Sequence, residues 1–218
     1  YAEEPNDTNS NARFSAAYAE QREKMDSKYH WLYSMDRQKI QDEIISKILG
    51  ENIVGFSRNE NPRRELSPTP HIYYTSGCYG VGKGYVMSWL SQKGFFPDNV
   101  VSINMDDIRV KLPEWNQFEK EDHETAGLRT QKEAGLIAEI AQAAAEKDRR
   151  HIVVDSSLRD WKWFSGIFDR LRTNGYIVNM LIVDASEETI RERTRPHVNT
   201  DARAHMPPPT HAHTRPPA

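Results

Sequence analysis

From His71 onward, short apolar runs alternate with longer segments in which apolar residues recur every three or four positions. The short runs predict strands at residues 71–76, 99–104, 150–155 and 176–184. The longer segments predict helices near residues 83–93, 120–147, 160–174 and 186–194. Near-continuous apolar strands that alternate with helices are typical of a parallel sheet covered on both faces. The pattern therefore predicts an α/β three-layer sandwich with a mainly parallel sheet.

The first part of the chain has a different pattern. A helical stripe of isoleucines and a leucine ends at Gly50, a residue typical of helix C-termini, and the segment 55–70 contains three prolines and many polar groups. We therefore expect two parts: an N-terminal helical extension and linker at residues 1–69, and a main domain at residues 70–218. The last 24 residues are rich in proline and histidine, and we expect them to be irregular.

A glycine-rich segment follows the first predicted strand of the main domain. Gly77 to Lys83 has the spacing G-x-x-x-x-G-K and precedes a predicted helix, which is the setting of a loop that binds nucleotide phosphates. In such a loop Lys83 reaches the β- and γ-phosphates. An ordinary glycine-rich turn is the alternative. The residues predicted to contact the nucleotide are Gly77, Cys78, Tyr79, Gly80, Val81, Gly82, Lys83, Gly84 and Tyr85.

Gly84 departs from the usual form of this loop. Most such loops carry Ser or Thr after the lysine, and its hydroxyl binds Mg²⁺. Because Mg²⁺ keeps several waters and is also held by phosphates, we expect a weakened metal site and no loss of nucleotide binding. The cofactors predicted from the loop are ATP and Mg²⁺.

Acidic residues follow two of the predicted strands. Asp106 and Arg109 come after the strand at 99–104, where a carboxylate is placed to accept a proton from a substrate hydroxyl. Helix capping is the alternative role of Asp106. Asp155 ends the strand at 150–155 and is followed by Ser157 and Arg159, which suit hydroxyls and phosphates. No direct metal ligand is predicted, although Asp155 is placed to orient a Mg²⁺-bound water; a solvated turn residue is the alternative.

Further charged residues are candidates on two helical segments. Glu133 lies four residues after Arg129, so a surface ion pair is one reading of this spacing. Beyond the last strand, Arg193 and Arg203 lie where a mobile lid would place arginines over the transferred phosphate. Arg191 and Arg193 cannot share one helical face, so we expect one of them to be solvated.

Composition excludes some classes of function. The chain has 218 residues and a formal charge of −3, with a sequence pI of about 6.3, so no overall positive field attracts nucleic acid or anionic membrane. No apolar run reaches the ~20 residues of a membrane span. The single cysteine, Cys78, cannot form an intramolecular disulfide and agrees with a reducing compartment. We therefore expect a cytoplasmic protein that acts on neither nucleic acid nor membrane.

Several motifs occur in the order found in the zeta toxin family, and the resemblance spans roughly residues 70–203. The stretches that carry it are SGCYGVGKGYVMSWL, VVSINMDDIRVKLPEW, EAGLIAEI and HIVVDSSLRDWKWF. The resemblance implies a phosphotransferase that uses ATP and Mg²⁺ to phosphorylate the 3′-hydroxyl of the sugar in UDP-N-acetylglucosamine. It also implies an antitoxin protein as a candidate partner. The N-terminal helices have no counterpart in these motifs.

The resemblance also implies roles for individual residues. Lys83 becomes the phosphate-binding lysine, Asp106 the base that activates the sugar hydroxyl, and Arg193 and Arg203 the lid arginines, although Asp201 and Ala202 interrupt the second lid motif. Contacts to the nucleotide sugar are implied for Glu133, Asp155, Ser157 and Arg159. Two alternatives stay open: a kinase for another small-molecule or nucleotide hydroxyl, and an ATP-binding module with weak catalysis.

Overall fold

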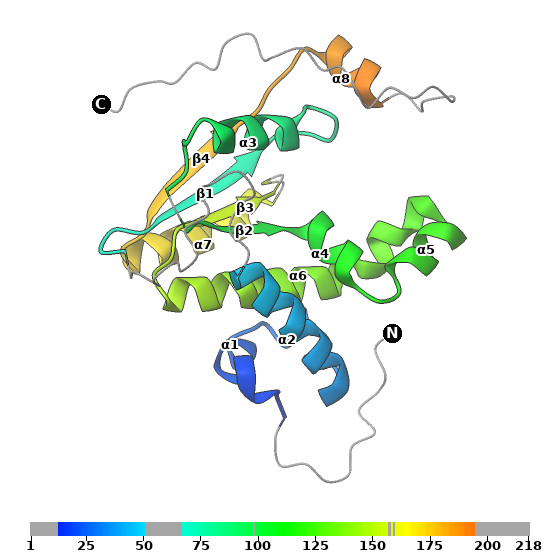
Figure 1. Cartoon of the computed structure of the whole chain (residues 1–218), viewed down its shortest axis with the longest axis vertical. Helices are drawn as coiled ribbons and strands as arrows, with labels where there is room; N and C mark the ends of the chain where they lie inside the picture. Colours follow the sequence, from blue (N-terminus) through cyan, green and yellow to red (C-terminus); the bar gives the residue numbers. More distant parts are fainter. Residues whose placement is uncertain (1–12, 51–66, 98, 157, 159, 195–218) are drawn as a thin grey trace.

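The computed structural model describes residues 13–50, 67–97, 99–156, 158 and 160–194, and a parallel sheet forms its centre (Figure 1). The strands are β1 (His71–Ser76), β2 (Val101–Asn104), β3 (Ile152–Asp155) and β4 (Ile177–Ile182). They are adjacent in the order β2-β3-β1-β4, and every pairing is parallel. Because all four strands run the same way, their carboxyl ends meet at one edge, where Asn104 of β2 lies opposite Asp155 of β3.

Helices cover both faces of the sheet. Adjacent residues of a strand point to opposite faces, and Tyr73 and Tyr74 show which helices lie there. Tyr73 packs in a cluster with Met87 and Leu90 of α3 (Lys83–Gln92), whereas Tyr74 packs edge-on against Phe164 of α7 (Trp161–Thr173). The long helix α6 (His123–Lys147) shares the face of α7. The predicted three-layer α/β fold with a parallel sheet is confirmed.

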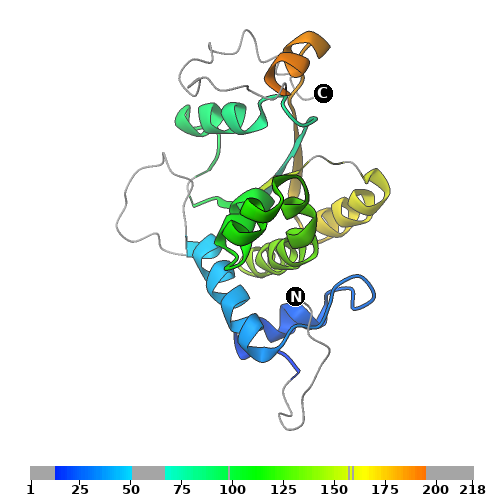
Figure 2. The same cartoon turned by 90° about the vertical axis from the view of Figure 1, so that its right-hand side faces the viewer.

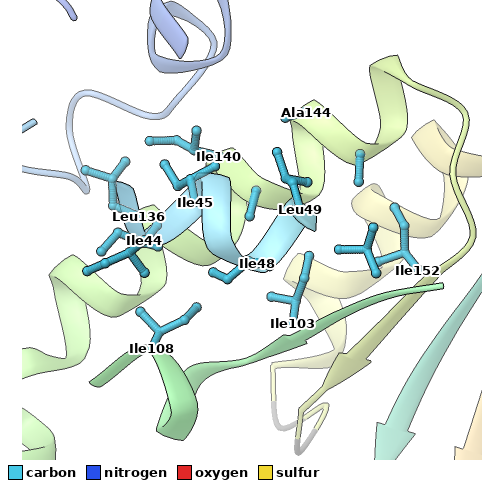
Figure 3. Close-up of a cluster of buried hydrophobic side chains, with 14 of the residues drawn as sticks. Ile44, Ile45, Ile48, Leu49, Ile103, Ile108, Leu136, Ile140, Ala144 and Ile152 are labelled. Atoms are coloured by element: carbon cyan, nitrogen blue, oxygen red, sulfur yellow. The ribbon is translucent and has the colours of Figure 1, made fainter. Parts of the chain in front are cut away.

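The largest core lies between α6, the sheet and α2 (Met35–Gly50) (Figure 3). The isoleucine stripe predicted for the N-terminal part is the buried face of α2, and Ile45 is completely buried against α6. This core continues through Ile103 of β2 and Ile152 of β3. At ~25 cal/mol per Å² of apolar surface, burying each of these side chains contributes about 2 kcal/mol. The N-terminal helix is therefore packed into the same core as the sheet.

The remaining elements are short. They are η1 (Ala16–Tyr18), α1 (Ala19–Glu23), α4 (Met105–Lys111), α5 (Trp115–Glu121) and α8 (Glu187–Thr194). The helix predicted at 120–147 begins instead at His123, because the Asp122 side chain accepts a hydrogen bond from the Glu124 amide at 3.0 Å and caps a new helix after α5. In the two views, α8 and α3 lie at one end of the molecule and α1 and α2 at the other (Figure 2).

None of the helices among the described residues is long and apolar enough to cross a membrane. The boundary at residue 69 stays a prediction, and the predicted irregular tail lies outside the described residues.

Candidate functional site

The loop between β1 and α3 has the backbone that the glycine spacing predicts. Gly77, Gly80 and Gly82 have φ angles of 153°, 80° and 98°, a region that other residues rarely adopt. A Cβ atom on Gly77 would lie 2.6 Å from the Val183 carbonyl oxygen, and one on Gly80 would clash with the methyl group of Thr194. Conformation and space therefore both require glycine at these two positions.

Lys83 is the first residue of α3 and folds back over this loop. Its Nζ donates hydrogen bonds to the carbonyl oxygens of Gly77 at 2.8 Å and Cys78 at 3.2 Å. No carboxylate among the described residues forms an ion pair with this ammonium group. Tyr79, at the loop tip, is 88% exposed. The tip of the loop is thus open to solvent, with the Lys83 ammonium group beside the loop.

Gly84 differs from the other loop glycines. Its φ is not positive, and a Cβ atom there would meet nothing within 4 Å. Neither strain nor crowding therefore requires glycine at this position. The nearest aliphatic hydroxyl along the helix belongs to Ser88, about one turn later, where it accepts a hydrogen bond from Gln92 at 3.2 Å.

Asp155 is held between the ends of three strands. The hydroxyl group of Thr75 in β1 donates a hydrogen bond to Asp155 Oδ1 at 2.7 Å. The side-chain amide of Asn104 in β2 donates one to Oδ2 at 3.3 Å. The Ser156 amide in turn donates to the Thr75 hydroxyl at 2.9 Å. Each carboxylate oxygen keeps capacity to accept further hydrogen bonds. Asp155 is therefore an oriented acceptor at the carboxyl edge; Ser157 and Arg159, which follow it, lie outside the described residues.

Asp106 lies one strand away, at the start of α4. The residue that caps α4 is Asn104, whose Oδ1 accepts from the Asp106 amide at 2.8 Å. The alternative role of Asp106 as the helix cap is therefore wrong. Its carboxylate is 82% exposed and forms an ion pair with Arg109, which also donates to Gln131 of α6. Asn104 thus performs the capping and leaves the Asp106 carboxylate facing solvent.

Arg193 connects α8 to the phosphate loop. Its Nη1 donates to the Val81 carbonyl oxygen at 2.8 Å, which places a guanidinium group against the loop. Arg191 instead bonds Glu187 on the exposed side of α8, as expected for residues two apart on a helix. The second predicted lid arginine, Arg203, lies outside the described residues.

Glu133 is placed differently from these residues. It is buried, and its two carboxylate oxygens accept from Arg37 of α2 at 2.7 and 2.8 Å, with a third bond from Gln41 at 2.7 Å. The anticipated ion pair with Arg129 does not form, because Arg129 bonds Glu121 at 2.6 Å. Glu133 is therefore joined to the N-terminal helix, and its contact with substrate stays a prediction.

Arg37 binds a second carboxylate at the same time. It donates to both oxygens of Glu114, at 2.6 and 2.8 Å, and this bonding lowers the pKa of Glu114 below its ordinary value. The arrangement links α2, α6 and the segment before α5 through a single guanidinium group. Every one of these bonds crosses between elements that are distant in sequence.

The residues of the loop fit a nucleoside triphosphate. The positive-φ glycines form a cradle that a Cβ would fill, and Lys83 supplies the cation beside it. Among the described residues no group of three or more His, Cys, Asp or Glu side chains could hold a metal ion. Any Mg²⁺ here would depend on phosphate oxygens and water, with Asp155 as the nearest oriented carboxylate.

Sequence reasoning missed three residues that shape the site. Thr75 positions Asp155, Gln131 holds Arg109, and Arg37 binds Glu133. Thr75 had a detectable signal, since it is a polar residue that is fully buried at the end of an apolar strand. The sequence contains no comparable signal for Gln131 and Arg37, because their partners are remote in sequence.

Comparisons with known proteins bear on the family and the fold. The family model for the zeta toxin matches residues 57–209. A structure from the PezAT chromosomal toxin-antitoxin system of Streptococcus pneumoniae is similar, with 18% identity and a TM-score of 0.57 over 80% of this chain and 63% of that one. The chain thus spans less than two thirds of that protein's length. A Pnkp1/Rnl/Hen1 complex matches at 15% identity, with a TM-score of 0.38 over 66% of this chain and 45% of that one.

A comparison with curated protein sequences finds no match. The structural similarity supports the fold, and the family model covers well over half of the chain. Together with the phosphate loop, they show that this chain belongs to the zeta toxin family, a family of P-loop phosphotransferases.

Proposed function

We propose that the protein transfers the γ-phosphoryl group of ATP to a sugar hydroxyl, with UDP-N-acetylglucosamine as the acceptor. The observation that supports this most is the exposed Asp106 carboxylate, which lies at the same sheet edge as Lys83 and Asp155 while Asn104 caps the helix in its place. An exposed carboxylate that pairs with one arginine and does not cap its helix, at the same end of the sheet as the phosphate loop, suits the activation of a hydroxyl.

In the proposed reaction the acceptor oxygen forms a bond to the γ-phosphorus as the bond to the β–γ bridging oxygen breaks, and ADP leaves. The hydroxyl proton passes to the Asp106 carboxylate. Lys83 and the loop amides hold the phosphates, and Arg193 and Arg203 offset the charge that develops on the transferred group. Arg109, Glu133, Asp155, Ser157 and Arg159 are proposed to hold the nucleotide sugar. Bound Mg²⁺ would neutralise the charge on the β- and γ-phosphates.

The test is to incubate the protein with ATP, Mg²⁺ and UDP-N-acetylglucosamine and to detect the phosphorylated sugar by mass spectrometry. The Asp106→Asn variant should lose activity by roughly 10²- to 10⁴-fold, the range for loss of a general base. Asp107→Asn is the matched control, because it changes a neighbouring acid and should retain activity. If no phosphorylated sugar forms, the acceptor is wrong; if Asp106→Asn keeps full ATP turnover, the base is wrong.

A second candidate is an ATP-binding module with weak catalysis, favoured by the missing hydroxyl at Gly84. The open space around Gly84 allows a direct test with two variants. Gly84→Ser adds a Mg²⁺ ligand, and Gly84→Ala adds only a methyl group. A Mg²⁺-dependent gain in turnover specific to Gly84→Ser would support a kinase limited by its metal site. Tight ATP binding unaffected by Mg²⁺ in every variant, without turnover on a panel of acceptors, would favour the module.

An antitoxin partner is also proposed, because the similar structure comes from a toxin-antitoxin system. Co-expression with candidate antitoxins, encoded by genes next to the gene for this protein, should yield a stable complex and suppress phosphorylation of the nucleotide sugar. If none of these candidate antitoxins lowers the rate of ATP turnover, this part of the proposal is contradicted. A cytoplasmic location stays a prediction of the sequence.

A further inference from the structure

The side chain of Asn104 lies between two acidic residues of the candidate site. At this residue β2 passes directly into α4, and β3 lies beside β2 (Figure 1). Asn104 is opposite Asp155 in the parallel register, so the two side chains point to the same face of the sheet. Asp106 follows Asn104 by two positions, in the first turn of α4. Asn104 is therefore placed to contact both acidic residues.

The two ends of the Asn104 side-chain amide have different partners. Its Oδ1 accepts hydrogen bonds from the backbone amides of Asp106 at 2.8 Å and Asp107 at 3.5 Å. Its Nδ2 donates to Asp155 Oδ2 at 3.3 Å. Because a backbone amide only donates and an ionised carboxylate only accepts, a single orientation of the Asn104 amide satisfies both sides. One side chain thus holds the backbone of Asp106 and the carboxylate of Asp155.

The line of hydrogen bonds continues from Asp155 to the strand that leads into the phosphate loop. The Thr75 hydroxyl donates to the other oxygen of Asp155, Oδ1, at 2.7 Å, and the Ser156 amide donates to that hydroxyl at 2.9 Å. Thr75 is completely buried, and it lies two residues before Gly77. The bonds therefore cross the carboxyl ends of β2, β3 and β1, from the start of α4 to the phosphate loop.

Phosphoryl transfer is sensitive to the spacing of the groups along this line. In the proposed reaction Asp106 takes the proton of the acceptor hydroxyl, and Asp155 holds the nucleotide sugar. The separation of these two carboxylates then decides whether the hydroxyl of the bound sugar reaches the base. A displacement of about 1 Å in such an arrangement can lower the rate by roughly 10²-fold. A side chain that fixes this separation therefore does more than cap a helix.

We propose that Asn104 is a positioning residue, which sets the distance between Asp106 and Asp155 and thereby the place of the acceptor hydroxyl. It acts through these two residues. The inference rests on the proposed function, because that function assigns the base and the sugar contact. The alternative is a capping role alone, in which case any residue that caps α4 equally well would replace Asn104 without loss of activity.

Three variants of Asn104 separate positioning from capping. Asn, Asp and Ser are about equally good helix caps. Asn104→Ser should therefore keep a melting temperature close to that of wild type, although its hydroxyl is too short to reach Asp155. Its KM for UDP-N-acetylglucosamine should rise about ten-fold, the usual effect of losing one hydrogen bond to a charged group, with kcat within about two-fold of wild type. Asn104→Ala loses the cap as well, so kcat should also fall by about ten-fold or more, because Asp106 is displaced. A wild-type KM in Asn104→Ser overturns the proposal.

The third variant, Asn104→Asp, gives a readout that capping alone would move in the opposite direction. It places two carboxylates side by side where wild type has a donor and an acceptor. A proton shared between them at low pH restores the hydrogen bond, whereas at high pH the two charges repel. The ratio of kcat/KM in the variant to that in wild type should therefore rise several-fold from pH 8 to pH 5.5. The neighbouring charges on α4, which are Asp106, Asp107 and Arg109, are the same in both proteins.

Capping alone predicts that this ratio falls at low pH, because protonation weakens the attraction between an acidic cap and the helix N-terminus. A ratio that falls, or that does not change, contradicts the proposal. Ser102→Asp is the matched control, because it adds the same charge to an exposed position of β2. Its KM should stay close to wild type, and its ratio should be equal at the two pH values.

A measurement without substrate separates this proposal from the proposed function. If the wild-type protein forms no phosphorylated sugar, the proposed function fails, and NMR then decides whether Asn104 joins the two acidic residues. Asp155→Ala should shift the side-chain amide signals of Asn104 in ¹H–¹⁵N spectra and leave the backbone amide signal of Asp106 in place. Unchanged side-chain signals of Asn104 overturn the proposal, whatever the acceptor is.

Discussion

The carboxyl edge of the sheet and the interface between α2 and α6 both contain charged residues, but they use them in opposite ways. At the interface, Arg37 is 17% exposed at its side chain and forms four hydrogen bonds to Glu114 and Glu133. At the edge, Lys83 donates to two backbone carbonyls and to no other group among the described residues, and Asp106, which is 82% exposed, pairs with Arg109. Arg37 thus uses four of its five N–H donors on two carboxylates, whereas Lys83 and Asp106 keep most of their capacity to bind other groups.

This difference separates structural charges from candidate catalytic ones. A buried ion pair with all its atoms bonded resists change, because removal of one partner leaves a charge without compensation. A charge held by a few weak contacts can exchange them for a ligand. Changes at Arg37 should therefore affect stability, and changes at Lys83 and Asp106 should affect activity. Glu133, which is also proposed to contact the nucleotide sugar, should affect both. The following four predictions test that division, from the largest effect to the smallest.

Lys83→Met should abolish most turnover while leaving the fold intact. The loss of one cation that stabilises transferred charge costs roughly 10²- to 10³-fold in rate. The two carbonyls that Lys83 contacts remain open to water, so the melting temperature should stay within about 2 °C of wild type. Steady-state ATP turnover and thermal unfolding measure the two effects. A large fall in melting temperature would place Lys83 with the structural charges.

Arg37→Met should destabilise the protein by about 3 kcal/mol, because Glu133 is then a buried charge without its partner. Urea unfolding measures this loss, and the double variant Arg37→Met/Glu133→Gln should recover part of it. Lys39→Met is the matched control on the same helix: its ion pair with Asp36 is exposed and should contribute less than about 0.5 kcal/mol. If Arg37→Met and Lys39→Met lower the free energy of unfolding by similar amounts, the interface charges are not specifically structural.

Within the phosphate loop, Gly80→Ala and Gly84→Ala should have opposite effects. Gly80 has a φ of 80° and no room for a Cβ, so the alanine should cost about 1–3 kcal/mol. Gly84 lies in α3 with open space around it, so the alanine should stabilise by about 0.5–1 kcal/mol. Denaturant midpoints compare the two directly. Destabilisation of similar size at both positions would show that Gly84 has a constraint that its surroundings do not reveal.

Acidification should lower the stability of the protein through His151, which lies at the amino-terminal ends of the strands, just before β3. Burial, with a smaller contribution from His71, lowers the pKa of His151 below its ordinary value of 6.5. Because the unfolded chain binds this proton more readily, the contribution of His151 is present above pH 6.5 and is lost as the pH falls below it. Urea midpoints at pH 8 and pH 5.5 should differ less in His151→Gln than in wild type. The exposed His123 is the control, and His123→Gln should keep the wild-type difference.

The sequence was sufficient to predict the sheet and the phosphate loop, because both depend on local patterns. The four strands are apolar runs, and the positive φ angles of Gly77, Gly80 and Gly82 follow from the motif. The break at Asp122 was missed because α5 ends one residue before α6 begins, and a single side-chain cap at Asp122 separates them.

The network around Glu133 was beyond sequence reasoning. Glu133 was interpreted from its spacing to Arg129, but its partner Arg37 comes from another helix, 96 residues away. The same applies to Gln131, which holds Arg109 across 22 residues. Pairings of this kind depend on how helices pack, and packing is set by the whole core.

The position of α2 has a consequence for how the protein folds during synthesis. Its isoleucine face leaves the ribosome about 90 residues before the part of α6 that covers it, and until then its partners in the described core are few, among them Tyr33 and Ile103. Contacts of such long sequence separation form late and slow the folding of the whole chain. The buried face of α2 is therefore completed only after α6 has been translated.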